Sequence, residues 1–377
     1  MKILITGNMG YLGPAVARQL RMSRPGAVIT GLDSGLFAGC LAVPQSLPQL
    51  LPECQMDYQC FADIRNFPRQ ILDGVDAVVH LAAAPGGPQS NLFEDVTFEI
   101  NYLATIELAN EARRRGVSSF VYASSCSIYG LAASGKKMME YATPNPLTAY
   151  AKSKVFSERQ LERFAGPGFK ITSLRFPEAC GMSERLRLDL VMNGFVAEAL
   201  STGQIVLPGG DAAWRPLINV KDMARAIDWA ISRDSSQGGH FLAVNAGSVD
   251  GNYRIKDIAL AVADEIPGIK VFASNESPAD ISSYAVDFSL FEKLAPEHQP
   301  LNGLRSSILE VKSGLEGSGL LGQNQDYRSS RFMRFKMLDE FISKKILSQK
   351  LLWVSNGYKG MEELAVTDAG YCCAGSK

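Results

Sequence analysis

The sequence has little of what marks metal, membrane or nucleic-acid-binding proteins. Only three histidines occur among 377 residues, and seven scattered cysteines form no CxxC pair, so a zinc site is disfavoured and a reducing compartment is favoured. The formal net charge of -1 gives no basis for binding nucleic acid. No apolar run is long enough to span a membrane, and the first residues lead directly into a short strand, with no signal peptide before it. We therefore expect a cytoplasmic, globular protein with no metal.

The first residues predict a nucleotide-binding unit. Residues 1–6 form a short apolar run, followed by a turn with Gly7, Gly10 and Gly13 and then an amphipathic run at 14–20. Glycines permit a tight turn and let a pyrophosphate approach the amides that begin the next helix. The second strand ends at Asp33, whose carboxylate suits the ribose diol of NAD. Because Ser34 rather than a basic residue follows, the sequence predicts NAD and not NADP.

A second stretch predicts chemistry on an alcohol. Tyr150 and Lys154 are four residues apart, so on a helix they share one face. An ammonium near a phenol favours the ionised phenol and lowers its pKa. Ser125 lies at the end of an apolar strand, where its hydroxyl could bind a substrate oxygen. These three residues together predict a catalytic site that takes a proton from an alcohol.

In this order, the motifs resemble an extended short-chain dehydrogenase/reductase of the nucleotide-sugar epimerase/dehydratase family. The resemblance runs from Met1 to about Glu310; each motif alone is weak, and the set in order is specific. It implies an α/β fold, a Rossmann-type doubly wound parallel sheet with a smaller C-terminal substrate-binding lobe. The implied parts are an NAD-binding domain at 1–177 and 209–248, a substrate-binding lobe at 178–208 and 249–353, and a flexible tail at 354–377.

The resemblance implies a set of cofactor-binding residues. They are Gly7, Gly10, Tyr11, Leu12, Gly13, Asp33, Asp63, Ile64, Leu81, Ala82, Ala83, Asn101, Tyr150 and Lys154. Asp63 matches a residue that contacts adenine in this family, although a helix cap is an equally good interpretation. His80 is interpreted as a structural histidine rather than a catalyst. Asn101 matches an asparagine that supports the water and lysine network of the active site.

The substrate-binding residues that the resemblance implies depart in part from the family pattern. They are Ser125, Cys126, Ser127, Glu178, Asn193 and Arg215. Cys126 and Ser127 replace the acidic pair of the dehydratases, which disfavours water elimination, and we favour packing over acid–base work for Cys126. Glu178 replaces an asparagine that supports substrate. Asn193 and Arg215 match positions that hold the nucleotide diphosphate, although Arg215 could also be an ordinary surface arginine.

These residues predict an NAD-dependent epimerase of a nucleoside-diphosphate sugar, with Ser125, Tyr150 and Lys154 as the catalytic set. A sugar hydroxyl would be oxidised to a ketone and then reduced from the other face. The alternative is a net NAD-dependent oxidoreductase on a nucleotide sugar or related alcohol. A non-enzymatic NAD sensor is disfavoured because a pure binder does not need all three catalytic residues. The family also implies a homodimer through the helices around Asn101 and Tyr150, while the sugar and the base stay open.

Overall fold

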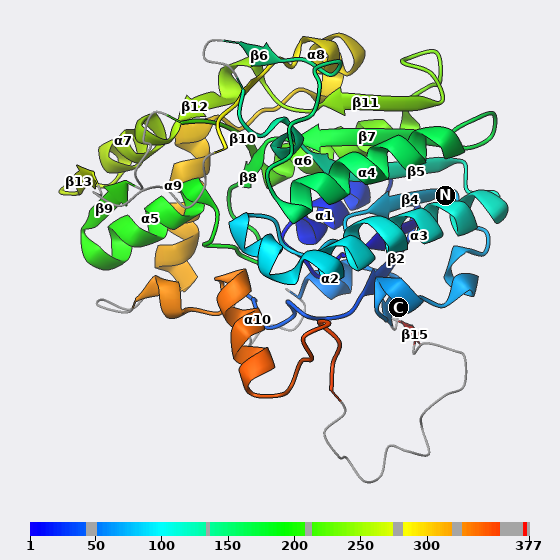
Figure 1. Cartoon of the computed structure of the whole chain (residues 1–377), viewed down its shortest axis with the longest axis horizontal. Helices are drawn as coiled ribbons and strands as arrows, with labels where there is room; N and C mark the ends of the chain where they lie inside the picture. Colours follow the sequence, from blue (N-terminus) through cyan, green and yellow to red (C-terminus); the bar gives the residue numbers. More distant parts are fainter. Residues whose placement is uncertain are drawn as a thin grey trace.

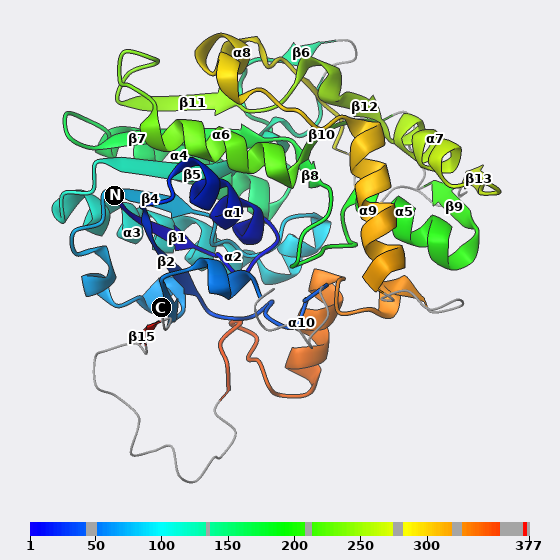
Figure 2. The same cartoon turned by 180° about the vertical axis from the view of Figure 1, so that it is seen from behind.

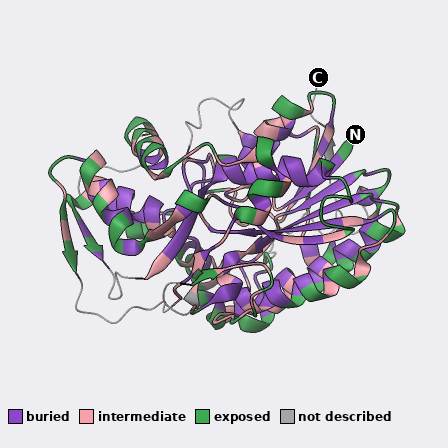
Figure 3. Cartoon of the chain, turned by 90° about the horizontal axis from the view of Figure 1, so that it is seen from above, coloured by how far each residue is buried: buried purple, intermediate pink, exposed green. Residues whose placement is uncertain are grey.

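The computed structural model describes residues 1–42, 51–132, 136–207, 213–273, 282–318, 326–354 and 372–374. In this part of the chain, helices cover both faces of a central sheet, and a smaller lobe lies to one side of it (Figure 1). Seen from above, buried residues follow the strands and exposed residues follow the outer helix faces (Figure 3). None of the helices in these ranges is both long and apolar enough to cross a bilayer.

The central sheet has seven parallel strands, in the order β11-β7-β5-β4-β1-β2-β3. Their bounds are β1 (Lys2–Thr6), β2 (Val28–Asp33), β3 (Tyr58–Phe61), β4 (Ala77–His80), β5 (Ser119–Ser125), β7 (Lys170–Phe176) and β11 (Phe241–Asn245). The chain order runs outward from β1 in both directions, and such sheets bind ligands at the carboxyl ends of the strands where the direction changes. The predicted α/β fold with a Rossmann-type doubly wound sheet is confirmed.

A short strand near the C-terminus extends this sheet. β15 (Cys372–Ala374) pairs antiparallel with β3 at the sheet edge. The sequence assigned no regular structure to this part of the chain, so β15 is an addition to the prediction. The rest of the expected tail, at 355–371 and 375–377, lies outside the described residues, and its flexibility stays a prediction.

Alternating strand residues build a core on each face of the sheet, because successive side chains of a strand point to opposite faces. Ile3 and Ile5 pack in the cluster that contains α1 and α6, whereas Leu4 packs in the cluster that contains α3. The helices on the first face are α1 (Gly13–Ser23) and α6 (Val220–Ser232) (Figure 2). Those on the second face are α2 (Glu94–Phe98), α3 (Ala104–Arg114) and α4 (Ala149–Phe164).

The smaller lobe has a hydrophobic core of its own. Its helices are α5 (Val191–Thr202), α7 (Ile255–Glu265) and α9 (Leu304–Ser318). Its strands are β8 (Glu178–Cys180), β10 (Trp214–Asn219) and β12 (Asn252–Arg254) in one sheet, and β9 (Gln204–Leu207) with β13 (Lys270–Ala273) in another. The predicted domain boundaries placed β10 in the NAD-binding domain. In the structure β10 pairs with β8 and β12, which are strands of the smaller lobe. Near β11 lie β6 (Lys137–Met138), β14 (Ala285–Val286) and α8 (Ser289–Leu294).

The last long helix, α10 (Arg334–Ser343), joins the two cores. Met337 packs in the core of the lobe, and Leu338 packs in the sheet core on the side of α3. The sequence pattern predicts a helix over 331–346 that packs on the lobe, and the structure confirms the helix. Its second contact, with the sheet core, brings Leu347 and Leu351 into the same core cluster as residues of β2 and β3.

Candidate active site

The turn between β1 and α1 can hold only glycine at two of its positions. Gly7 has a φ of +74°, and a Cβ atom there would lie 2.5 Å from the backbone nitrogen of Ala82. A Cβ atom on Gly13 would lie 1.9 Å from the carbonyl oxygen of Asn8. The absence of side chains therefore lets the turn lie directly against the end of β4, at the start of α1, where backbone amides are available to an anion.

A cavity opens in front of this turn. Among the predicted cofactor-binding residues, those that line it are Gly7, Gly10, Asp33, Asp63, Ile64, Leu81, Ala82 and Ala83. The carboxylate of Asp33 accepts hydrogen bonds from the backbone nitrogens of Met9 and Gly35, at 2.9 and 2.8 Å, and burial raises its pKa. A cavity beside a helix start, with a fixed carboxylate after β2, fits the adenosine half of NAD.

Asp63 and Asn101 each have a described role beside this cavity. Asp63 accepts a bond from the backbone nitrogen of Arg65 and pairs with the Arg65 guanidinium at 2.7 Å, so the helix-cap interpretation is confirmed. Its contact with adenine stays a prediction. Asn101 lies in a π-helical segment (Glu99–Leu103), and its Oδ1 accepts from the backbone nitrogen of Ala84 at 2.7 Å. Its buried Nδ2 has no partner among the described residues, which leaves a donor for the cofactor or a water.

His80 is a structural residue, as expected. Its two ring nitrogens lie 2.6 Å from Thr6 Oγ1 and 2.8 Å from Thr105 Oγ1, and burial lowers its pKa to about 3. Tyr11 and Leu12, which the resemblance places among the cofactor residues, do not line the cavity. The Tyr11 hydroxyl donates to the carbonyl of Gly181 at 2.5 Å and so joins the glycine turn to the lobe. The side chain of Leu12 packs on the core under α1.

The three predicted catalytic residues come together at the end of β5. α4 begins after Thr148, whose hydroxyl accepts from the backbone nitrogen of Ala151, and this start sets Tyr150 and Lys154 on the face toward β5. The Ser125 side chain lies beside the Tyr150 hydroxyl and lowers its pKa. Lys154 Nζ donates to the carbonyl of Ala123 at 2.7 Å and lies 5.3 Å from the centre of the Tyr150 ring. The sequence-based prediction of one constellation agrees with this placement.

The electrostatics of this constellation differ from the expectation for a phenol beside an ammonium. Burial raises the pKa of Tyr150, and the charge of Arg187 and the neighbouring Ser125 side chain lower it only in part. Burial also lowers the pKa of Lys154 to about 7, against the raising effect of Glu158. Without a cofactor, desolvation therefore outweighs the attraction between these charges and favours the neutral form of each group.

The residues after Ser125 have two different environments. Ser125 Oγ accepts from the backbone nitrogen of Ser127 at 3.1 Å, which starts a short 3₁₀ turn (Cys126–Tyr129). Cys126 is fully buried, donates from Sγ to the carbonyl of Arg175 at 3.2 Å, and has a pKa raised by burial. The packing favoured from the sequence agrees with this burial, and the contact of Cys126 with substrate stays a prediction. Ser127 is only partly buried as a residue, but its Oγ is buried without a hydrogen-bond partner among the described residues, and its contact with substrate stays a prediction.

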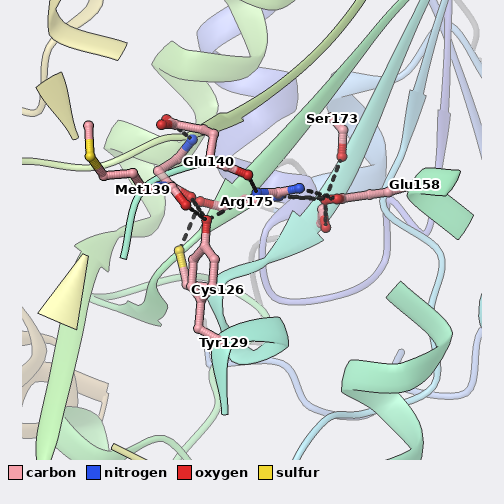
Figure 4. A network of polar contacts seen from close by, with 9 residues as sticks. Cys126, Tyr129, Met139, Glu140, Glu158, Ser173 and Arg175 are labelled. Atoms are coloured by element: carbon pink, nitrogen blue, oxygen red, sulfur yellow. Dashed lines mark hydrogen bonds and ion pairs between the residues drawn. The ribbon is translucent and has the colours of Figure 1, made fainter. Parts of the chain in front are cut away.

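A buried ion pair lies one helical turn beyond Lys154 (Figure 4). Glu158 of α4 pairs with Arg175 of β7 at 2.7 Å, and both side chains are less than a tenth exposed. Ser124 of β5 donates to the same carboxylate at 2.5 Å. Arg175 also donates to the hydroxyl of Tyr129 at 3.1 Å. This network fixes α4 against the ends of β5 and β7, and it thereby fixes the distance between the catalytic side chains.

The predicted diphosphate residues are Asn193, near the start of α5, and Arg215 in β10, and both bond to protein groups. Arg215 is buried and not a surface arginine; its Nε lies 3.6 Å from a Glu178 carboxylate oxygen, and its Nη1 donates to Ser282 Oγ at 2.7 Å. The other Glu178 oxygen accepts from the backbone nitrogen of Val191, at the start of α5, at 2.7 Å. An internal carboxylate therefore lies between the arginine and helix start that an anionic ligand would use.

Asn193 has an internal role. Its side chain is fully buried, its Oδ1 accepts from the nitrogen of Gly181 at 3.1 Å, and its Nδ2 donates to the carbonyl of Arg187 and the hydroxyl of Tyr11, both at 2.9 Å. With donor and acceptor both engaged, the side chain orders the turn before α5. Direct contact of this side chain with a diphosphate would require these bonds to break.

Sequence reasoning missed several residues of the site. Arg187, which pairs with Asp189 at 2.8 Å, is the cation that lowers the pKa of Tyr150, and its only sequence signal is the spacing of the two charges. Gly86 lies against the Tyr150 ring, because a Cβ atom there would be 3.1 Å from it. Leu338 and Leu351 line the cofactor cavity from the C-terminal end of the chain, where no motif points to them. In the described part of the chain, no group of three potential metal ligands occurs.

Comparison with known proteins agrees with this architecture. The model of the NAD dependent epimerase/dehydratase family matches residues 3–247. The Bacillus subtilis protein YtcB, named an uncharacterized UDP-glucose epimerase, is 26% identical over 330 residues, which cover 84% of this chain and 100% of that protein. The dTDP-glucose 4,6-dehydratase of Streptomyces griseus is 25% identical over 313 residues, which cover 81% of this chain and 92% of the enzyme.

Solved structures share the fold. MoeE5, in complex with UDP-glucuronic acid and NAD, superposes with a TM-score of 0.70 at 24% identity, over 84% of this chain and 100% of the other. The UDP-glucuronic acid 4-epimerase of Bacillus cereus, with UDP-glucuronic acid and NAD, gives a TM-score of 0.71 at 20% identity, over 84% and 99% of the two chains.

The buried amine of Lys154 predicts a pH-dependent loss of stability in the cofactor-free protein. Its pKa is about 7 when folded, against about 10.4 in an unfolded chain. Between these values the unfolded chain binds more protons, so this group makes stability rise with pH; below pH 7 its full cost is present. Lys154→Met should therefore be the more stable protein near about pH 6, by on the order of 2–4 kcal/mol, and this gain should shrink toward about pH 10.

Urea unfolding of Lys154→Met and Lys152→Met at both pH values checks this prediction. Lys152 is an exposed lysine of the same helix and serves as the matched control. A stability difference for Lys154→Met that is independent of pH, or that equals the effect of Lys152→Met, would contradict the burial of this charge.

Proposed function

Because this chain belongs to the NAD dependent epimerase/dehydratase family, we propose that it is an NAD-dependent epimerase of a nucleoside-diphosphate sugar. The observation that carries the proposal is the meeting of Ser125, Tyr150 and Lys154 at the end of β5, beside the cavity that contains Asp33. Relatives named epimerases and relatives named dehydratases both occur. The buried thiol of Cys126 and the neutral Ser127, in place of two carboxyl groups, support epimerisation over water elimination.

The chemistry follows from the roles that these side chains can take. When bound, NAD supplies a reversible hydride acceptor with a positively charged ring. Tyr150 takes the proton of a sugar hydroxyl on its phenolate oxygen as the carbon loses hydride, and Ser125 shares the hydrogen bond to that hydroxyl. The charge of Lys154, 5.3 Å from the Tyr150 ring centre, stabilises the phenolate. Return of the proton from Tyr150 completes the opposite alcohol without net oxidation.

Product analysis separates this proposal from a net oxidoreductase. UDP-glucose, UDP-glucuronic acid, UDP-N-acetylglucosamine and dTDP-glucose are each incubated with far less NAD than sugar. An epimerase accumulates an epimer in excess of the NAD supplied, and no reduced cofactor builds up. An oxidised sugar formed in proportion to reduced cofactor would favour the oxidoreductase, and the names of the 4-epimerase relatives make C4 the first carbon to examine.

Tyr150→Phe removes the proton acceptor and keeps the ring that packs on Gly86. We expect a loss of turnover of about 100- to 10,000-fold or more, with NAD binding retained, because the hydride step depends on the same proton. Tyr141→Phe is the matched control, because Tyr141 is 83% exposed, and it should keep normal turnover. Near-normal turnover of Tyr150→Phe would show that another group takes the proton.

Variants at Arg215 and Glu178 should change the affinity for a nucleoside diphosphate in opposite directions. Arg215→Ala should weaken the binding of the preferred nucleoside diphosphate by about 1.5–3 kcal/mol, or roughly tenfold to a hundredfold. Glu178→Gln should strengthen it, because the variant removes a negative charge beside Arg215 and the start of α5. NAD affinity should stay constant in both variants, because neither residue lines the cofactor cavity.

Calorimetry with the diphosphates of uridine, thymidine, guanosine and cytidine tests this pair. If no diphosphate binds, the substrate is not a nucleotide sugar. If Glu178→Gln weakens binding instead, Glu178 holds the ligand directly and the proposed arrangement of charges is wrong.

We include a homodimer in the cytoplasm in this proposal. Leu103 of the π-helical segment and Phe156 of α4 are exposed by 57% and 45%, on the helices expected to pair. The Phe156 ring of α4 lies 5.8 Å from the Phe98 ring of α2, so the apolar side chains of these two helices form one patch. Three buried cysteines, Cys40, Cys126 and Cys180, form no disulfide, which suits a reducing compartment.

Light scattering should give about twice the chain mass of 40.9 kDa. Leu103→Glu should convert the protein to single chains with NAD binding intact, whereas Leu301→Glu, at an exposed leucine elsewhere, should not. A single-chain mass for the unaltered protein would rule the dimer out.

A further inference from the structure

The end of the chain supplies a second wall for the cofactor cavity. Leu338 of α10 and Leu351 line the same cavity as Asp33 and Asp63. Both leucines are almost fully buried, at 1% and 3% exposure. Residues 331–354, here called the C-terminal clamp, lie beyond the 3–247 that match the family model. The part of the cavity that the clamp closes is therefore formed by residues outside the family region.

One side of the clamp is fastened through Arg65. Its Nη1 donates to the carbonyl of Lys350 at 2.9 Å, and its Nη2 reaches the carbonyl of Leu351 at 3.5 Å. The same guanidinium pairs with Asp63 at 2.7 Å. Arg65 thus connects a residue of the cavity wall with the backbone of the residue that closes the cavity, and it holds Leu351 in a left-handed conformation, with a φ of +53°.

The other side is fastened through Trp353. Its Nε1 donates to the carbonyl of Ser34 at 2.7 Å, directly after Asp33. Its ring lies 5.8 Å from that of Phe341 in α10. A hairpin holds it there, because the nitrogen of Val354 donates to the carbonyl of Ile346 at 2.9 Å. The indole therefore joins the clamp to the loop that carries the ribose-binding carboxylate.

The first residues of the clamp contact the same loop, which follows Asp33. The Arg334 guanidinium lies 4.2 Å from the centre of the Phe37 ring, and Phe37 lines the cavity. Cys40 Sγ donates to the carbonyl of Arg331 at 3.0 Å. In Figure 1, α10 lies below the β2 side of the sheet, next to the loops after its strands. Three separate attachments thus place the clamp against one end of the cavity.

We propose that the C-terminal clamp is a cofactor-binding element that encloses the adenosine half of NAD. Leu338 and Leu351 supply apolar surface against that half, and Trp353 prevents the loop after Asp33 from moving away. The physical consequence is slow release of the dinucleotide, because the clamp must detach from Ser34 and Arg65 before the adenosine can leave. The inference depends on NAD binding alone and not on the reaction or the sugar.

The first test uses ADP as a probe of the adenosine half, by calorimetry on protein freed of nucleotide. Leu351→Ala should weaken ADP binding by about fivefold to tenfold, since part of a buried leucine contact is lost. The matched control is Leu347→Ala, because Leu347 is buried to the same degree in the same hairpin and hydrophobic cluster but does not line the cavity. Leu347→Ala should bind ADP as the unaltered protein does.

Equal weakening by the two alanine variants would overturn the proposal, because the clamp would then act only through general stability. Unchanged ADP affinity in Leu351→Ala would overturn it as well. ADP carries neither nicotinamide nor the sugar that is to be epimerised, so this test can fail while the proposed epimerase activity stands, and the reverse also holds.

The second test measures release and uses a variant at an exposed site. Trp353→Phe keeps the ring beside Phe341 but loses the N–H that bonds Ser34, and Trp353 is 46% exposed. Displacement of bound NADH by excess NAD, followed by fluorescence, should be about two- to tenfold faster than in the unaltered protein. Leu352→Ala, an exposed neighbour that does not line the cavity, should release NADH at the normal rate. Unchanged release in Trp353→Phe, or equal acceleration in Leu352→Ala, would contradict the clamp.

Discussion

The buried pair of Glu158 and Arg175 is the interaction on which the active site depends. Burying two charges is expensive, but removing one partner of such a pair leaves an uncompensated charge and typically costs about 3–5 kcal/mol. The carboxylate comes from α4, the guanidinium from β7, and the bond from Ser124 comes from β5. These three elements are therefore held together one helical turn from Lys154 and one residue from Ser125, which sets the geometry of the proposed catalytic groups.

Beside this buried ion pair, desolvation determines the protonation states of Tyr150 and Lys154. Burial raises the pKa of Tyr150 and lowers that of Lys154, so both groups favour their neutral forms in the absence of a cofactor. A positive charge entering beside them shifts Tyr150 toward its ionised, proton-accepting form. The carboxylate of Glu158 opposes the loss of charge on Lys154. The site is thus arranged so that proton transfer becomes favourable when a positively charged cofactor is present, which links cofactor binding to catalysis.

Local patterns predicted the parts of the site that depend on one turn or one helix face. The glycine turn, Asp33 and the Tyr150–Lys154 spacing follow from backbone geometry, and the order of these motifs predicted the sheet. The pairing of Glu178 with Arg215 could not be predicted, because it joins two strands through side-chain directions that spacing does not define. For the same reason, matching Asn193 to a family position did not reveal that its side chain is fully buried, whereas the packing favoured for Cys126 agrees with its burial. The C-terminal clamp carries no motif, and its role depends on tertiary packing alone.

We propose that this site moves hydride off and back onto one sugar carbon while Tyr150 carries the proton. A nucleotide sugar with deuterium on the carbon that is epimerised tests this claim most directly, with NAD in catalytic amount. The account predicts that the epimer retains the deuterium and that none appears in water or in released cofactor. Deuterium in released cofactor would show net oxidation, and loss of deuterium to water would show that a carbon-bound proton is removed instead. Either result would contradict the account.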